Sequence, residues 1–196
     1  AAPGPDGTPQ PSAAAAGAAQ WRTLRWTVVS MLVGMVSCSP ATRARLWSAN
    51  ALDLLLGLLG EEDTRVQLGV LQALDVWLAE DHSRVEPRLV QRDAVGSLVG
   101  LYARPTTAQE LQSKLEALRG LLLQSSKLAK ALASPQAAPA GGSAGSAAAA
   151  VGGAAPSLVP YLLAMIPGAA PINRVKILDI VRVLYEHYPR PKEFIV

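Results

Sequence analysis

Few residues of this chain have the type and spacing that catalysis requires. His82 and His187 each lie near the end of an expected long helix, where a histidine commonly bonds backbone carbonyl groups or faces solvent. The acidic run 61–63 precedes another helix, where carboxylates complement the positive end of the helix dipole. Cys38 is the single cysteine, and no helix N-terminus or basic neighbour activates it. We therefore expect no catalytic residue and no metal site.

A glycine-rich tract at 141–153 resembles a phosphate-binding loop only superficially. It lacks the Lys-Ser/Thr pair that ends a P-loop, and it contains no Gly-x-Gly-x-x-Gly preceded by a strand. The kinase catalytic motifs His-Arg-Asp, Asp-Phe-Gly and Val-Ala-Ile-Lys are also absent from the sequence. We expect this chain to bind no cofactor and not to be an enzyme.

The composition favours a helical protein in a reducing compartment. The 196 residues are 50 % hydrophobic and 5 % aromatic, and outside the alanine-rich tracts they are rich in Leu and Val with few β-branched alternations. A single cysteine excludes an internal disulfide and fits a reducing compartment. The apolar run 26–38 is too short for a bilayer core, which needs about 20 apolar residues, so we expect no transmembrane segment.

Apolar residues at helical spacing, broken by Pro and Gly, define the elements that must position any site. Residues 1–19 form an Ala/Pro/Gly flank that we expect to be disordered. From residue 20, Leu24, Val28, Leu32 and Met35 share one face of a first helix. Thr107 and Glu110 form a capping box that opens another long helix. Further helices are expected after Pro40, after a cap at Asn50, and over 63–81, 85–91, 93–103, 156–166 and 172–188.

The helices recur in a fixed order and spacing. Leu46, Leu89 and Leu132 lie 43 residues apart. A second set matches at an offset of 44, namely Leu71, Leu74, Trp77 and Leu78 with Leu115, Leu118, Leu121 and Leu122. A period of about 43 residues with three helices per unit is typical of armadillo or HEAT repeats. We therefore expect an all-α fold, an armadillo/HEAT-like α-solenoid of about three and a half repeats.

The repeats are expected over 20–133 and, truncated at the C-terminus, over 156–196. The low-complexity tract 134–155 separates these two parts, and removing about 20 residues restores the repeat register. We therefore interpret the tract as an insertion in a loop. A non-repetitive helical bundle remains a competing architecture, whereas a coiled coil is disfavoured because Gly and Pro interrupt every periodic segment within about 25 residues.

Two surfaces are candidates for protein binding. The third helices of the units, expected at 50–59, 93–103 and 156–166, would line a concave face. Its exposed polar positions would be Asn50, Gln91, Arg92 and Asp93. At the end that begins the array lies the densest basic group, a solvated face or a docking surface for an acidic protein segment. This group consists of Arg22, Arg25, Arg43 and Arg45.

Aromatic residues are assigned by their place on the helices. Trp77 lies on the inward face of its helix and is expected in the core, whereas Trp21 and Trp26 would cover an open end of the array. Tyr185 is expected to continue an inward stripe with Ile177, Leu178 and Val181.

Two segments resemble a known family. The run LDVWLAEDHSRVEPRLVQRDAVGSLV at 74–99, followed by RVKILDIVRVLYEHYPRPKEFIV at 174–196, is similar to the C-terminal armadillo-type region of the MAP kinase kinase kinase epsilon group of plants and algae. Fungal kinases that initiate septation are related to that group. The resembling pieces are Val76 to Asp81, Arg88 to Val95 and Tyr185 to Val196.

The resemblance implies a non-catalytic protein-interaction scaffold, the regulatory or localising part of a serine/threonine kinase in cell-division signalling. ATP and Mg would then belong to a kinase domain elsewhere in the polypeptide, and the partner would be a protein or peptide, including its own kinase domain. The implied location is the cytoplasm, at division structures or the membrane periphery. An alternative function, nucleic-acid binding by a basic solenoid, follows from the pI near 9.3. The helices lack a recurring Arg or aromatic pair that would read bases.

Overall fold

The structure is a computed structural model that describes residues 13–104, 106–134 and 157–188. All regular secondary structure in these ranges is helical, so the expected all-α class is confirmed. The predicted insertion, apart from residue 134, lies outside the described residues, as does the segment 189–196. The helices are α1 (Ala13–Cys38), α2 (Pro40–Ser48), α3 (Ala51–Leu58), α4 (Thr64–Glu80), α5 (His82–Leu89), α6 (Arg92–Tyr102), α7 (Ala108–Gln124), α8 (Ser126–Ala133), α9 (Val159–Met165) and α10 (Pro171–Glu186).

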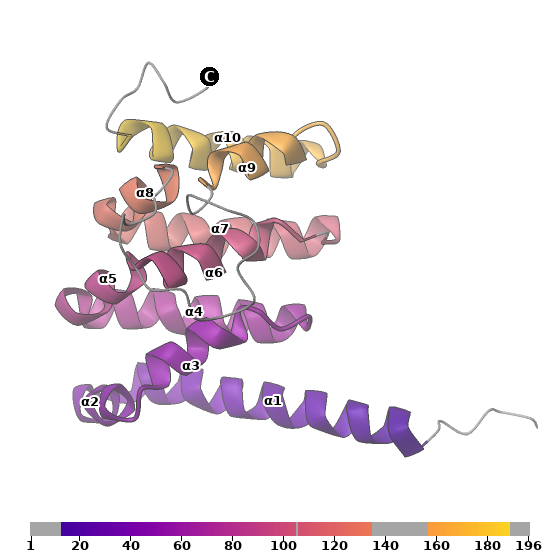
Figure 1. Cartoon of the computed structure of the whole chain (residues 1–196), viewed down its shortest axis with the longest axis vertical. Coiled ribbons are helices and arrows are strands. Elements are labelled where there is room, and N and C mark those ends of the chain that lie inside the picture. Colours follow the sequence, from indigo (N-terminus) through magenta and orange to yellow (C-terminus); the bar gives the residue numbers. More distant parts are fainter. Residues whose placement is uncertain (1–12, 105, 135–156, 189–196) are drawn as a thin grey trace, which may run out of the picture.

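The long helices α1, α4, α7 and α10 lie one above the next in sequence order (Figure 1). Each of the last three packs on the long helix before it. Two short helices follow each of the first three long helices, and the pairs are α2 and α3, α5 and α6, and α8 and α9. We call one long helix together with its two short helices a unit. The units are therefore stacked in sequence order from α1 to α10.

Local capping explains where several helices begin. Thr107 and Glu110 form both hydrogen bonds of a capping box at α7, which confirms the sequence prediction. Asp63 accepts the backbone N–H of Arg65 at the start of α4. Ser125 accepts the backbone N–H of Leu128 at the start of α8. These side chains satisfy N–H groups that the helices themselves leave unbonded.

Two predictions about helix ends were wrong. Helix α1 begins at Ala13, so the flank expected to be disordered over 1–19 is helical from residue 13. Asn50 precedes α3, but its side chain makes no capping hydrogen bond. Its backbone is left-handed, with φ of 54°, a conformation that asparagine adopts more readily than most residues.

The predicted inward residues of α4 and α7 form the centre of the core. Trp77 is 1 % exposed, which confirms its assignment, and its ring packs edge-on against Trp47 with centroids 6.3 Å apart. Equivalent positions of successive long helices are buried to the same degree, as Leu71, Leu115 and Ile177 show. Burying one such side chain contributes about 1.5–3 kcal/mol. Contact between consecutive units therefore supplies the main stabilising term.

Sequence periodicity assigned the wrong face on the first and last long helices. On α1 the predicted stripe is largely exposed, and Val29 and Val36 on another face are fully buried. On α10, Leu178 and Tyr185 are exposed, which contradicts their inward assignment. The buried residues of α10 are Asn173, Ile177, Ile180, Val183 and Leu184. Both helices are apolar on more than one face, so periodicity alone cannot select the covered one.

Polar contacts join consecutive units along the short helices. Arg43 of α2 is 5 % exposed, and its guanidinium bonds Glu80 at 2.8 Å and Asp81 at 3.2 Å in the next unit. Glu86 of α5 is likewise 5 % exposed, and its carboxylate accepts from Ser125 at 2.7 Å and from Lys127 at 2.8 Å. A buried charge is tolerated only when it is paired. These pairs therefore specify how each unit sits on the next.

Helices α1 and α4 approach closely at Gly69. A Cβ atom at this position would lie 2.9 Å from Val29 Cγ1 and 3.2 Å from the Trp26 ring. Gly34 of α1, by contrast, has nothing within 4 Å of an added Cβ. The absence of a side chain at Gly69 thus sets the spacing of these two helices.

Replacing Gly69 by Leu is expected to destabilise the chain by about 1–3 kcal/mol, because the new side chain must push α1 away from α4. Urea unfolding followed by circular dichroism measures the change. Gly34→Leu is the matched control and is expected to be neutral or stabilising by up to about 1 kcal/mol through helix propensity. Equal losses for the two variants would contradict the close packing of α1 on α4.

The Glu86 contact makes stability depend on pH. Burial raises the pKa of the Glu86 carboxyl, but hydrogen bonds from Lys127 and Ser125 outweigh it and hold that pKa below its ordinary value. The carboxylate therefore stabilises the fold above its unfolded-state pKa of about 4.3, and this contribution is lost as the pH falls through the lowered value.

Glu86→Gln is expected to cost about 2 kcal/mol at pH 7. The difference in unfolding free energy between wild type and variant should shrink toward pH 3, as measured by urea titrations at several pH values. A difference that stays constant over that range would show that the Glu86 charge does not link α5 to α8.

Candidate functional site

The side chains that could take part in catalysis or metal binding make structural contacts. His82 opens α5, and its Nε2 lies 3.1 Å from the carbonyl oxygen of Gln124 in the next unit. His187 Nδ1 lies 2.8 Å from the carbonyl oxygen of Val183, one turn earlier. Within the residues that the structure describes, no three His, Cys, Asp or Glu side chains gather as a metal site would require.

Two of the four predicted polar positions, Asn50 and Asp93, lie beside Arg88, which the sequence analysis did not propose as a site residue. Arg88 of α5 bonds Asp53 of α3 at 2.7 Å and Asp93 of α6 at 2.6 Å. The hydrogen bond from Arg88 holds the pKa of Asp93 below its ordinary value. Asn50 lines a cavity of about 100 Å³ beside Arg88, together with Trp47, Leu52 and Asp53. Gln91 and Arg92 are exposed at the start of α6.

The predicted basic group is divided by the fold. Arg22 and Arg25 are exposed and line a cavity of about 370 Å³ whose opposite wall is the acidic run 61–63. Arg25 forms an ion pair with Glu61 of that run. Arg45 is exposed on α2. Arg43 is buried between units, so the expectation that it belongs to an exposed docking surface was wrong.

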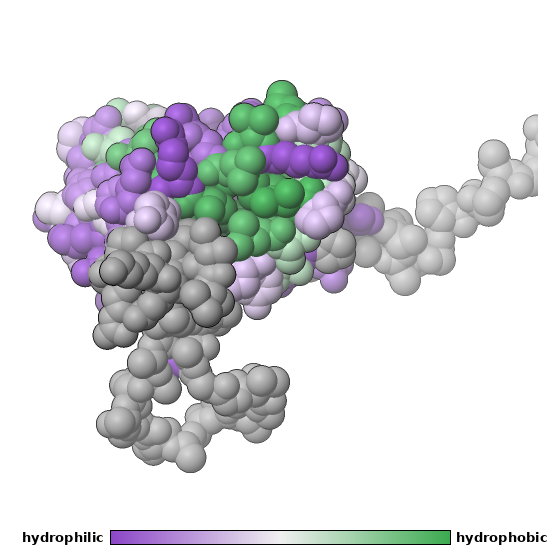
Figure 2. Space-filling model, turned by 90° about the horizontal axis from the view of Figure 1, so that it is seen from above, coloured by the Kyte–Doolittle hydropathy of each residue, from purple (hydrophilic) through white to green (hydrophobic). Residues whose placement is uncertain are grey.

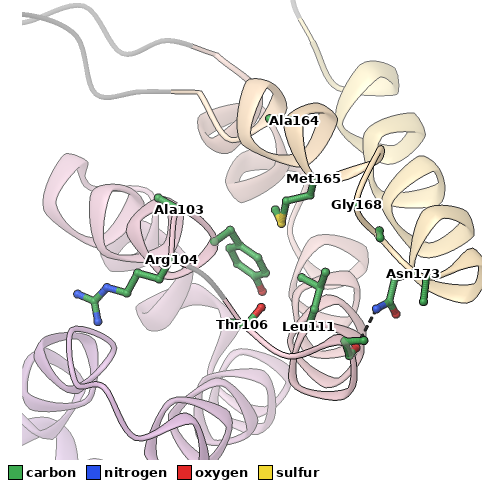
Figure 3. A pocket seen from close by; sticks show the side chains of 12 residues that line it. Ala103, Arg104, Thr106, Leu111, Ala164, Met165, Gly168 and Asn173 are labelled. Carbon is green, nitrogen blue, oxygen red and sulfur yellow. Dashed lines mark hydrogen bonds between the residues drawn. The ribbon is translucent and has the colours of Figure 1, made fainter.

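Another cleft opens where α6 meets α7 and α9 meets α10 (Figure 3). Its volume is about 360 Å³. Figure 3 shows Met165 and Leu111 facing each other across the cleft, whereas Arg104 points away from it. The lining residues are Tyr102, Ala103, Arg104, Thr106, Ala108, Leu111, Ala164, Met165, Gly168, Ala169, Ala170 and Asn173.

Polar groups of the cleft are mostly used within the protein. Asn173 is 1 % exposed and donates from Nδ2 to the carbonyl oxygen of Ala108 at 2.8 Å, while its Oδ1 has no partner within the described residues. Tyr102 donates to the carbonyl oxygen of Lys114 at 2.8 Å, and burial raises the pKa of its hydroxyl. Arg104 donates to the carbonyl oxygens of Gly60 and Glu61. The cleft therefore offers apolar side chains and backbone, which suits a protein segment better than a charged small molecule.

The groove expected from the sequence includes two of the helices that form the cleft, but the cleft lies elsewhere along them. The expected groove lies on the third helices, and the cleft touches the C-terminal ends of α6 and α9. The polar residues predicted to mark the groove lie instead at the N-terminal ends of α3 and α6. Helix α6 has 11 residues, so its two ends are about 16 Å apart. Thr106 and Gly168 lie in the loops that complete the wall of the cleft, and the sequence analysis selected neither.

The membrane prediction was tested on the same helices. Among the described residues, none of the helices combines the length and the hydropathy that a bilayer span requires.

Comparison with known proteins places this chain beside one group of kinases. No protein-family model matches the chain, and no solved structure matches it. The chain is 29 % identical over 175 residues to MAP3K epsilon protein kinase 1 of Brassica napus, and 27 % identical to MAP3K epsilon protein kinase 1 of Arabidopsis thaliana. MAP3K epsilon protein kinase 2 of Arabidopsis thaliana is 26 % identical over 174 residues. Each match covers 88 % of this chain but only 11–12 % of the relative, so the chain is similar to a small part of these kinases.

Proposed function

We propose that this chain is an armadillo/HEAT-like α-solenoid of about three and a half repeats that serves as a non-catalytic protein-interaction scaffold. The observation that carries the proposal is the recurrence of one packing contact. Each long helix lies on the next, with Leu71, Leu115 and Ile177 buried at the same position of successive units. Arrays of this kind present extended surfaces to protein partners.

The scaffold belongs, in this proposal, to a serine/threonine kinase of the MAP3K epsilon type. Support comes from the three plant relatives and from the motif resemblance over 74–99 and 174–196. The segment would regulate or localise the kinase in cell-division signalling, in the cytoplasm, at division structures or the membrane periphery. ATP and Mg would bind to the kinase domain, outside this segment.

The cleft between the α6–α7 and α9–α10 connections is the proposed binding site for a partner segment. Its wall of Leu111, Met165 and the alanines can receive an apolar side chain, and Ala164 is exposed at its edge. The partner is a protein segment, either from another chain or from the kinase domain of the same polypeptide.

Nucleic-acid binding is less well supported than protein binding. Several of the basic side chains that motivated it form internal ion pairs, including those of Arg43, Arg88 and Arg119. Cations already paired with carboxylates release few counterions from a phosphate backbone, and counterion release drives such binding.

A pull-down with matched variants tests the scaffold and its cleft. Ala164→Arg places a long charged side chain at the edge of the cleft and is expected to reduce captured partner at least fivefold. Leu123→Arg is the control, because Leu123 is 60 % exposed on α7 and does not line the cleft. Circular dichroism verifies that both variants remain folded. Identical capture by the two variants, or capture of background proteins alone, would overturn the proposal.

A kinase assay tests the regulatory role separately. Deleting the matched segment from a MAP3K epsilon relative is expected to change the kinase's cellular position or its activity in the intact polypeptide. The isolated kinase domain, which lacks the segment, provides the reference activity against which the intact and the deleted polypeptides are compared. An intact kinase whose position and activity are both unaffected by the deletion would argue against regulation.

A further inference from the structure

Helix α1 exposes a continuous apolar stripe. Its members recur every three or four residues, so they share one face of the helix over four turns. All five positions are apolar. We call this set the α1 stripe: Trp21, Leu24, Val28, Met31 and Met35, which are 65, 50, 47, 62 and 41 % exposed.

The corresponding face of α4 is completely covered. Residues 42 positions after Leu24, Val28, Met31 and Met35 are Val66, Val70, Ala73 and Trp77, and each is at most 1 % exposed. The offset is fixed by the buried pairs Val29 with Leu71 and Val36 with Leu78, all at 0 % exposure. The preceding unit packs against α4 here, since α1 and α3 contact α4 and Trp47 of α2 packs edge-on against Trp77. The α1 stripe is therefore the position at which an earlier unit would pack.

Helix α7 repeats the relationship. Lys114 and Leu121 occupy the positions of Val70 and Trp77 and are 2 % and 0 % exposed, and α4 packs on α7. On α4 and α7 these positions are thus buried where the preceding unit packs, with Trp47 of α2 against Trp77 and Tyr102 of α6 bonded to the Lys114 carbonyl oxygen, and they are open on α1.

The opposite end of the stack does not support the same argument. Figure 2 looks onto that end and shows an apolar patch, and Leu178 and Tyr185 of α10 are 54 % and 44 % exposed. Their equivalents on α7 are Glu116 and Leu123. Both remain exposed although α10 is in place. These positions are therefore exposed even inside the stack, so their exposure on α10 carries no argument about a further neighbour.

We propose that the α1 stripe is covered by the helices of a further helical unit of the same polypeptide, placed on α1 as the unit of α1, α2 and α3 is placed on α4. The proposal rests on the repeat arrangement of the proposed function. Its support is that the α1 stripe occupies the same helix positions as the covered faces of α4 and α7. The relatives also extend far beyond the matched part, which is 11–12 % of their length.

A long connection before α1 is compatible with such packing. Residues 134–158 separate α8 from α9, yet the stack continues across them. The backbone N–H of Leu158 donates to the carbonyl oxygen of Leu132 at 2.9 Å, and Leu162 of α9 is fully buried. Helices of this chain thus pack together even when the segment that connects them is long.

Hydroxyl-radical footprinting tests the proposal by comparing the 196-residue chain with the complete natural polypeptide. Met31, Met35 and Trp21 should react rapidly in the 196-residue chain and at least tenfold more slowly in the complete polypeptide. Leu123 and Val175, which are 60 % and 68 % exposed, should react equally in both and serve as controls. Unchanged reactivity of the α1 stripe in the complete polypeptide would overturn the proposal.

A second copy of the chain is the rival occupant. Protection of the stripe that rises with the concentration of the 196-residue chain, together with a dimer in sedimentation, would also overturn the proposal.

A substitution provides an independent readout. Met31→Glu is expected to lower the melting temperature of the complete polypeptide and to leave that of the 196-residue chain unchanged, whereas Val175→Glu should be neutral in both. Equal effects of Met31→Glu in the two proteins would contradict the inference. These measurements do not involve the partner cleft, so a failed pull-down and a failed footprint are distinguishable.

Discussion

Contact between consecutive long helices is the interaction on which the rest of the structure depends. The short helices have 7 to 11 residues, too few to be stable in isolation, and they bury their apolar faces against the stacked long helices. Each leucine buried in this stack contributes about 1.5–3 kcal/mol. Gly69 allows α1 to approach α4, and the fully buried Leu71, Leu115 and Ile177 continue the contact. Stability therefore rests on contacts between neighbouring helices, and these contacts join into one continuous apolar core.

Paired charges at the unit boundaries complement this apolar packing. Apolar contact is non-directional, so it does not by itself fix the register of one helix on another. Arg43 and Glu86 are buried and each reaches across to the following unit, where a shifted register would leave a charge unpaired. The same geometry brings the ends of α6, α7, α9 and α10 together and creates the cleft. The candidate binding site is thus a consequence of stacking, assembled from α6 of the second unit, α7 and α9 of the third, and α10 after them.

The sequence predicted the recurring parts of this arrangement and not the places where units meet. The offset of 44 correctly identified Leu71, Leu74 and Trp77 with their counterparts as buried, because equivalent positions face equivalent neighbours. It could not choose between the apolar faces of α1 or α10, since that choice depends on which neighbour is present. Arg43 was placed on the surface because a charged side chain is usually exposed. Its pairing with Glu80 and Asp81 is a contact over 37 and 38 residues that local spacing does not reveal.

The register of α1 on α4 is the most direct test of stacking by repeated units. In a Cys38→Ser background, Val29→Cys and Gly69→Cys should form a disulfide on mild oxidation. A Cβ on residue 69 would lie 2.9 Å from the Val29 Cγ1 position. This distance suits a disulfide, in which the Cβ of one cysteine lies about 3 Å from the Sγ of the other. Val36→Cys with Gly69→Cys, two turns away, should not cross-link. Rapid cross-linking of Val29→Cys with Gly69→Cys alone is the predicted result. Equal cross-linking of both pairs, or of neither, would contradict the account.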